Sequence, residues 1–293
     1  MAFKFEPVNC CIYCGKTNIV LGAEHIIPFG LGGQLILPKS SCKACGDATG
    51  KFEGVVQRTI YGDFRMSRGL QTRHKKERPS HRIIGTIDQH GNTSQKSISV
   101  RDYPAPYWVY TFGNCGIFLG THPDTNVTLG NLKTIPDNTA LTAFAAEHNW
   151  DRKLQFRYMP NEFMRMIAKI GYSFATAVVG YSGFRPLILG SIMNSEANPS
   201  YFVGMNEIQE PSGLNHNHEL KLLIQGRLAG TTLLIVHARL FPYAETPTYH
   251  AVVGEFVDGT QEQIAINKII KLKDVQFSRA SGDIIPPFAI GGV

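Results

Sequence analysis

Two pairs of cysteines near the N-terminus constrain this chain more than any other feature. The pairs are Cys11-Ile-Tyr-Cys14 and Cys42-Lys-Ala-Cys45, roughly thirty residues apart. A gap of two residues lets both thiolates of a pair reach one tetrahedral ion, and two such pairs form the ligand set of a structural zinc site. Four unrelated thiols are the alternative, but the doubled spacing favours Zn²⁺. A zinc ion would stabilise a segment too short to fold on a hydrophobic core alone.

The segment between the cysteine pairs carries an acidic residue beside a histidine. Glu24-His25 is followed by Ile26-Ile27-Pro28 and then by Gly32-Gly33. Adjacent residues of a β-strand point to opposite faces, so Glu24 and His25 can serve one site only if the strand bends or ends there. The proline and the glycines just downstream favour such an ending. The alternative is an ordinary polar pair at the end of a strand.

These motifs together resemble the HNH (ββα-metal) endonucleases of the zinc-knuckle type. The resemblance covers residues 8 to 60 and rests on both cysteine pairs, on Glu24-His25-Ile26-Ile27-Pro28 and on Gly32-Gly33. It implies a β-hairpin and a helix around one divalent cation, with His25 as the general base and Glu24 as a metal ligand. It also implies hydrolysis of phosphodiester bonds, with DNA favoured over RNA, and a catalytic divalent cation beside the structural Zn²⁺.

The chain departs from the HNH pattern where the helix should carry its metal ligands. Gly46 follows Cys45, and position 50 is also glycine, so neither position has a side chain that binds metal. Glu53 and Asp47 are the nearest substitutes, and Glu53 lies about one helical turn beyond Gly50. A carboxylate at either position would suit Mg²⁺ or Mn²⁺.

The positive charge of the chain is concentrated directly after this segment. The formal net charge is +6, and the stretch from residue 58 to residue 82 contains eight cationic residues against Asp63 and Glu77, with Tyr61 and Phe64 interleaved. Such a stretch predicts contact with phosphates of nucleic acid, weakened by salt. A solvated linker is the alternative. The predicted nucleic-acid-binding residues are Arg58, Arg65, Arg68, Arg73, Lys75, Lys76, Arg78 and Arg82.

The pattern of the whole chain predicts an α+β protein. We expect a zinc-stapled ββα-metal (HNH-like) nuclease module over residues 1–56, a basic connector over 57–80, and a larger mixed α+β domain of unrecognised fold over 81–293. This last domain would recognise the target or regulate the nuclease. Strands are expected at 82–88, 96–100, 108–112, 116–119, 201–204, 220–224, 232–237 and 249–257.

The clearest predicted helix begins at Pro160 and ends at Gly180. Its apolar residues recur at helical spacing, and Arg165 and Lys169 are expected on the opposite, polar face. Weaker patterns predict helices over 138–149 and 261–272. The aromatic residues at 103, 107, 108, 110 and 112 are expected to be strand core, with a base-stacking surface as the alternative.

The sequence favours a cytoplasmic protein. It begins without the apolar core of a signal peptide, its apolar runs are too short to span a bilayer, and its six cysteines suit a reducing compartment.

The leading functional hypothesis is a metal-dependent DNA endonuclease, with a role in restriction or defence against foreign DNA. One alternative is a catalytically degenerate, zinc-dependent nucleic-acid-binding protein. Another is a nuclease gated by a small-molecule or protein activator that the C-terminal domain senses. A homodimer would suit cleavage of both strands, although no residue argues for it.

Overall fold

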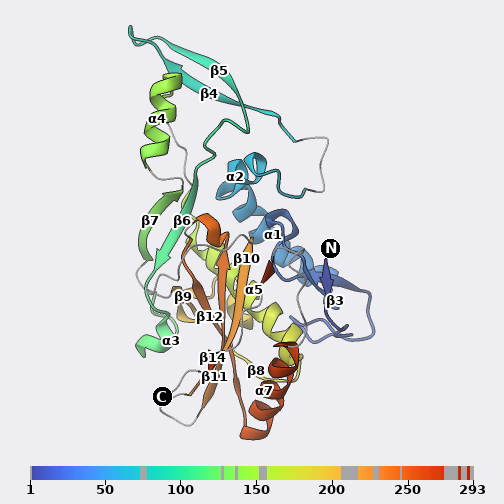
Figure 1. The fold of residues 1–293 in the computed structure, drawn as a ribbon. Coiled ribbons are helices and arrows are strands. Elements are labelled where there is room, and N and C mark those ends of the chain that lie inside the picture. The colour runs from blue at the N-terminus through green and yellow to red at the C-terminus, as the bar shows by residue number, and fades with distance from the viewer. Residues whose placement is uncertain are drawn as a thin grey trace.

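The structure is a computed structural model that describes residues 2–72, 78–126, 129–135, 138–151, 157–205, 217–226, 231–244, 246–273, 283–284 and 289–290. Helices and antiparallel sheets are mixed along the chain, so the predicted α+β class is confirmed (Figure 1). Among these residues, no helix is both long enough and apolar enough to cross a membrane.

The N-terminal part is a β-hairpin followed by a helix. Strand β2 (Leu21–His25) pairs antiparallel with β3 (Leu35–Cys42), and α1 (Lys43–Thr59) begins directly after β3. The two-residue strand β1 (Phe3–Lys4) adds to β3 in parallel. A short helix, α2 (Gly62–Ser67), follows α1. Helix α1 therefore extends beyond residue 56, where the sequence placed the end of the module.

Two glycines shape the turn between β2 and β3. A single 3₁₀ turn, η1 (Phe29–Leu31), follows Pro28, and Gly32 ends it with a φ of 88°, a conformation that favours glycine. A Cβ atom at Gly33 would collide with the carbonyl oxygen of Ile27. The Gly-Gly pair is thus required for the chain to turn back tightly behind His25.

The larger part is built on a twisted, mainly antiparallel sheet. Its centre is the meander of β10 (His218–Gly226), β11 (Thr232–Leu240) and β12 (Tyr249–Phe256). Four short strands extend it, namely β8 (Arg185–Pro186), β9 (Val203–Met205), β13 (Asp283–Ile284) and β14 (Ala289–Ile290). Every residue of β12 is buried, which means that both faces of the sheet are covered.

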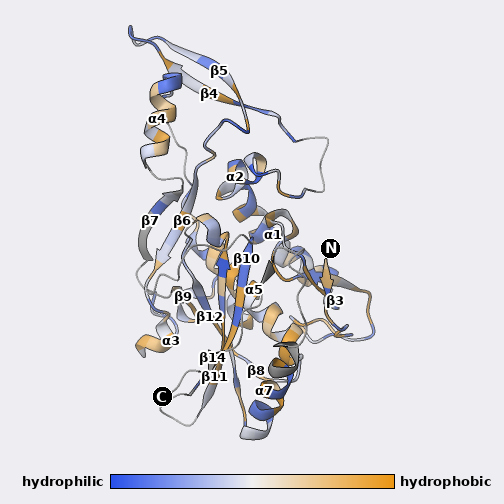
Figure 2. Ribbon diagram, viewed as in Figure 1, coloured by the Kyte–Doolittle hydropathy of each residue, from blue (hydrophilic) through white to orange (hydrophobic). Residues whose placement is uncertain are grey.

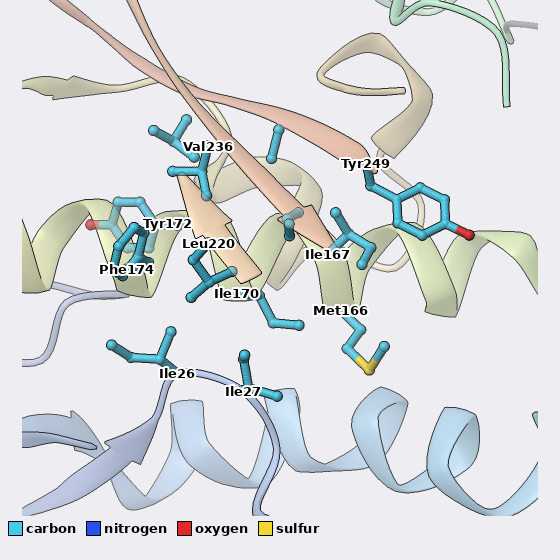
Figure 3. Close-up of a cluster of buried hydrophobic side chains, with 14 of the residues drawn as sticks. Ile26, Ile27, Met166, Ile167, Ile170, Tyr172, Phe174, Leu220, Val236 and Tyr249 are labelled. Carbon is cyan, nitrogen blue, oxygen red and sulfur yellow. The ribbon is translucent and has the colours of Figure 1, made fainter. Parts of the chain in front are cut away.

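Helix α5 (Pro160–Val179) is the central helix of the molecule. Pro160 lies in the first turn of this helix. The apolar side chains of α5 pack against β11 and β12 (Figure 3). Its other side is also covered, because Ile26, Ile27 and α1 lie against it (Figure 3). Nearly all of its residues are therefore buried, as expected of a helix between two layers.

A long hairpin extends from this body. Strands β4 (His81–Ile87) and β5 (Thr93–Ser99) project to one end, beside α4 (Asn138–His148), and their residues are largely hydrophilic (Figures 1 and 2). A second pair, β6 (Tyr107–Phe112) and β7 (Leu129–Ile135), joins the hairpin to the body. Packing at the base of the hairpin comes from a small separate core of Ile84, Ile98, Tyr103, Ala105 and Phe144, with Trp150 against it.

The remaining helices are α3 (Gly116–Leu119), α6 (Leu189–Met193) and α7 (Gly259–Lys273), with single 3₁₀ turns η3 (Pro199–Tyr201) and η4 (Pro242–Ala244). The three predicted helices and most of the predicted strands are confirmed. The strand predicted at 116–119 is wrong, because that segment is α3, closed by Gly120 with a φ of 66°. The strand predicted at 201–204 begins only at Val203, since Tyr201 belongs to η3.

The expected polar face of α5 is also wrong for Lys169, which is fully buried. The pattern anticipated one covered face, whereas the N-terminal layer covers the second one. Side chains of the larger part bind that layer directly: the Tyr172 hydroxyl donates to the carbonyl of Ile12 at 2.7 Å, and His218 Nε2 lies 2.9 Å from the carbonyl oxygen of Leu31. One continuous hydrophobic cluster contains residues of both parts.

Gly171 fixes how closely α5 approaches the sheet. A Cβ atom there would lie 2.9 Å from Cβ of Ala251 and 3.2 Å from Cγ1 of Val253. We expect Gly171→Leu to lower the free energy of unfolding by about 1–3 kcal/mol or more, because the added side chain overpacks the contact. Urea denaturation measures the change. Gly190→Ala in α6, where an added Cβ meets nothing within 4 Å, is the control. Equal stability of Gly171→Leu and wild type would contradict this packing.

Candidate functional site

The four predicted zinc ligands lie together. The sulfur atoms of Cys11, Cys14, Cys42 and Cys45 are all within 4.8 Å of one another, and those of Cys14 and Cys42 are 3.9 Å apart. Four thiolates around a zinc ion at about 2.3 Å lie about 3.8 Å from each other, so the cluster has the size that a metal ion such as zinc needs. Cys10, although next to Cys11, is not part of the cluster.

Local backbone structure brings the two pairs together. The first pair lies in a tight turn in which the Gly15 amide donates to the Cys11 carbonyl, and Gly15 has a φ of 71°. The Ile12 amide donates to the carbonyl of Ser40, which ties this turn to β3. The second pair spans the junction between β3 and α1, since Cys42 ends the strand and Cys45 lies in the first turn of the helix.

The cluster also favours a thiolate at one position before any metal binds. Burial raises the pKa of the Cys11 thiol, but hydrogen bonds from the backbone amides of Cys42, Cys14 and Tyr13 outweigh it and lower this pKa to about 7. A thiolate is the form that binds metal.

A cleft of about 740 Å³ lies beside the cysteine cluster, between the hairpin and α1. Residues of β2 and of the following turn line one wall, and the other wall is one face of α1. Along that helix, Gly46, Gly50, Glu53, Gly54 and Gln57 recur at the spacing of a single face. The cleft is also lined by Glu24, His25, Pro28, Phe29, Asp47, Arg58 and Arg65.

Glu24 and His25 reach the same cleft because β2 ends at His25. The pairing of β2 with β3 also shifts its register between Gly22 and Glu24. Glu24 is 6% exposed, whereas His25 is half-buried, with its ring 5.5 Å from the ring of Phe29. The strand therefore ends at His25, which meets the condition for Glu24 and His25 to share one site.

Glu53 joins Glu24 through a residue that the sequence did not place here. Lys169 of α5 extends its ammonium group between the two carboxylates, with Nζ 2.5 Å from Glu24 Oε1 and 2.7 Å from Glu53 Oε1. It also donates to the backbone carbonyls of His25 and Ile26. The Lys169 side chain is completely inaccessible to solvent.

The pKa shifts follow from this arrangement. Burial alone would lower the pKa of Lys169, but the negative charges of Glu24 and Glu53 outweigh it and raise that pKa above its usual value. Burial raises the pKa of Glu53, and Glu24 raises it further, while Lys169 opposes both. Lys169 thus stays charged, and it is the cation that compensates the two acidic side chains.

These contacts decide whether the predicted catalytic ion fits. Mg²⁺ or Mn²⁺ would need the carboxylate oxygens of Glu24 and Glu53, and one oxygen of each is already bound to Lys169. The divalent ion therefore does not fit this pair as the structure describes it. The other predicted ligand, Asp47, lies in the cleft but is exposed and forms an ion pair with Lys43 at 2.6 Å. At Gly50 the cleft is open, since an added Cβ would meet nothing within 4 Å.

The predicted nucleic-acid-binding residues have different environments. Arg73, Lys75 and Lys76 lie outside the described residues. Arg65 and Arg78 donate to backbone carbonyls, of Gly30 and of Leu70 respectively, so part of their role is structural.

Three arginines of the predicted set are exposed. The Arg68 guanidinium stacks on the ring of Tyr243 at 5.5 Å, and Arg82 lies 3.4 Å from Asp63. Arg58 lines the cleft. Tyr61 and Phe64, which are interleaved with these arginines in the sequence, are buried and belong to the core.

A second cavity, of about 790 Å³, adjoins the cleft at Arg58, which lines both. It contains two further arginines, Arg82 and Arg157, and the aromatic residues Trp108 and Trp150. Of the aromatic residues in the predicted strand region, Tyr103, Tyr107, Tyr110 and Phe112 are buried core, as expected, and Trp108 is the half-buried exception. We call this cavity the arginine–tryptophan cavity.

Sequence reasoning missed Lys169, Trp150 and Arg157. For Lys169 a signal existed, because it is the one charged residue in the largely apolar stretch from Met166 to Phe174. Trp150 and Arg157 carry no local signal, since only the folding of distant segments brings them to Arg58. Comparison of the chain with protein-family models, with curated proteins and with solved structures finds no match.

The cysteine cluster predicts a defined metal content. We expect the purified protein to contain about one zinc ion per chain and Cys42→Ser to contain almost none, because three thiolates bind zinc more weakly than four. Loss of the ion should also lower the melting temperature. Elemental analysis and circular dichroism measure both effects. Cys10→Ala is the control, since that thiol lies outside the cluster, and zinc loss in this variant would contradict the assignment.

Proposed function

We propose that the protein is an endonuclease that hydrolyses phosphodiester bonds of nucleic acid in the cleft between β2 and α1. The main support is the position of His25 and Glu24 at the end of β2, facing α1 across one cleft and beside the cysteine cluster. This is the arrangement that the resemblance to zinc-knuckle HNH endonucleases implies, and that resemblance favours DNA as the substrate.

His25 is proposed as the general base. A neutral imidazole can take the proton of a water molecule near pH 7 as that water attacks the phosphorus atom. The ring lies at the cleft surface, against Phe29, and the carbonyl group of the same residue is held by Lys169. Contacts on both its side chain and its backbone keep this residue in place, which a positioned base requires.

Phosphate binding is proposed for the cationic rim. Arg58 lines both the cleft and the arginine–tryptophan cavity, and Arg82 and Arg157 line the latter. Arginine side chains form paired hydrogen bonds with phosphate, and tryptophan rings stack on bases. A strand that crosses the cleft can therefore continue into the arginine–tryptophan cavity, with Arg58 at the junction.

His25→Ala tests the catalytic proposal. We expect this variant to lower the rate of plasmid nicking by about 10²–10⁴-fold, because the general base is lost while zinc content and nucleic-acid affinity are retained. Supercoiled plasmid is incubated at low salt with each of several divalent metals, and the products are separated on agarose. His90→Ala, in the exposed turn of the β4–β5 hairpin, is the control. A fully active His25→Ala protein would rule out this mechanism.

Arg58→Gln tests the binding path. We expect weaker binding to all nucleic-acid sequences and a decrease of about one in the slope of log affinity against log salt concentration, because one phosphate contact is removed. Fluorescence anisotropy with a labelled oligonucleotide measures both quantities. Arg101→Gln is the control, since Arg101 is exposed and lines neither cavity. Equal salt slopes for Arg58→Gln and wild type would remove Arg58 from the path.

A non-catalytic nucleic-acid-binding protein is the second candidate. Lys169 favours it, because this residue neutralises the carboxylates that a catalytic ion would use. Gly46 and Gly50 also stand on α1 at the two positions where HNH endonucleases carry metal ligands, and glycine has no side chain to bind a metal ion. Binding without any cleavage across Mg²⁺, Mn²⁺, Ca²⁺ and Ni²⁺, by wild type and by variants of Lys169 alike, would select this candidate.

A further inference from the structure

A lysine side chain that is completely inaccessible to solvent is unusual beside a cleft that is open to solvent. Lys169 is 0% exposed, although both of its acidic partners line that cleft. Burying an ammonium group is strongly unfavourable unless it is paired and hydrogen-bonded. Here the surroundings provide what the ammonium needs, through two carboxylates and the carbonyls of His25 and Ile26.

This environment has the composition of a site for a hard cation. Four oxygen atoms, two of them from carboxylates, surround one positive centre, and divalent magnesium, manganese and calcium prefer ligands of the same kind. An ammonium has three N–H groups to donate, fewer than the four oxygen atoms that surround this one. The place between Glu24 and Glu53 is therefore filled by a side chain of the protein itself.

We propose that Lys169 is the resident cation of the Glu24–Glu53 pair and excludes divalent metal ions from it. A divalent ion binds to the pair only when the Lys169 ammonium leaves. This proposal deepens the proposed function, and only its biological meaning rests on that function. The exclusion of metal ions is a binding property, so it can be measured without any cleavage assay.

The surroundings of α5 explain why Lys169 does not leave by a simple change of side-chain conformation. The sheet covers one side of the helix, and the hairpin and α1 cover the other. Arg165, one turn earlier, is also held in place, with its guanidinium 4.7 Å from the centre of the Phe52 ring on α1. Release of Lys169 therefore requires α5 and the N-terminal layer to separate locally, a movement that an activator could favour.

Direct titration with Mn²⁺, followed by electron paramagnetic resonance on the zinc-loaded full-length protein, tests the proposal. We expect wild type to show no saturable Mn²⁺ site, and Lys169→Met to bind one Mn²⁺ per chain with an affinity at least about tenfold higher than the weak, non-saturating binding of wild type. The added site should be lost in the double variant Lys169→Met with Glu53→Gln. Lys169→Gln, whose amide still donates to the carboxylates, is measured as well in case the methionine variant does not fold.

Lys268→Met is the matched control. Lys268 of α7 is an exposed lysine whose Nζ also reaches α5, where it lies 2.6 Å from the carbonyl oxygen of Val179. Its removal should leave Mn²⁺ binding as in wild type.

Thermal stability gives an independent measurement. When no Mn²⁺ or Ca²⁺ is added to the zinc-loaded protein, the melting temperature of Lys169→Met should lie about 10 °C below that of wild type, because Glu24 and Glu53 lose their counter-ion. Mn²⁺ or Ca²⁺ should restore most of this loss in the variant and leave wild type unchanged.

The outcomes separate this inference from the proposed function. A saturable Mn²⁺ site in wild type that disappears in Glu53→Gln would overturn the exclusion, even if the protein cleaves DNA. Absence of the site from both Lys169 variants would also overturn it. Suppose that Lys169→Met binds Mn²⁺ and that neither this variant nor wild type cleaves any nucleic acid. That result would support the exclusion and reject the endonuclease.

Discussion

The buried ammonium of Lys169 is the interaction on which the arrangement of the site depends. It compensates Glu24 of the hairpin and Glu53 of α1 simultaneously, and it holds the backbone of His25. Without a cation at this point, two acidic side chains would face each other in a poorly solvated place, and the hairpin and helix would repel one another. The cleft has its present shape because a residue from the larger part of the molecule joins its two walls.

The N-terminal layer is therefore held in two different ways. At one end of the cleft, the cysteine cluster brings the first turn of α1 against the turn of Cys11 and Cys14, where a bound metal ion would fasten the two together. Helix α5 holds the other side through Lys169, Tyr172 and the apolar contacts of Ile26 and Ile27. The cysteine cluster, which has the arrangement of a metal site, and the hydrophobic core thus both lie against a segment that has little interior of its own.

Sequence predicted those parts of the site that local spacing determines. The clustering of the cysteine pairs, the end of β2 at His25 and the position of Glu53 at the cleft all follow from intervals of two to about fifty residues. Lys169 could not be placed in this way. Its burial depends on a second layer over α5, and a helical pattern reports only that a face is apolar, not how many layers will cover the helix. The same limit applies to the arginine–tryptophan cavity, whose residues are brought together by packing between distant segments.

The distance along the chain between Lys169 and its partners has a consequence for synthesis. The lysine lies 144 residues after His25, so the hairpin and α1 emerge from the ribosome long before α5 exists. During that interval Glu24 and Glu53 have no internal counter-ion. A nascent chain, or a fragment that ends before α5, is therefore chemically different from the finished protein, and the segment that most resembles a nuclease acquires its final electrostatic state only when the rest of the chain has folded onto it.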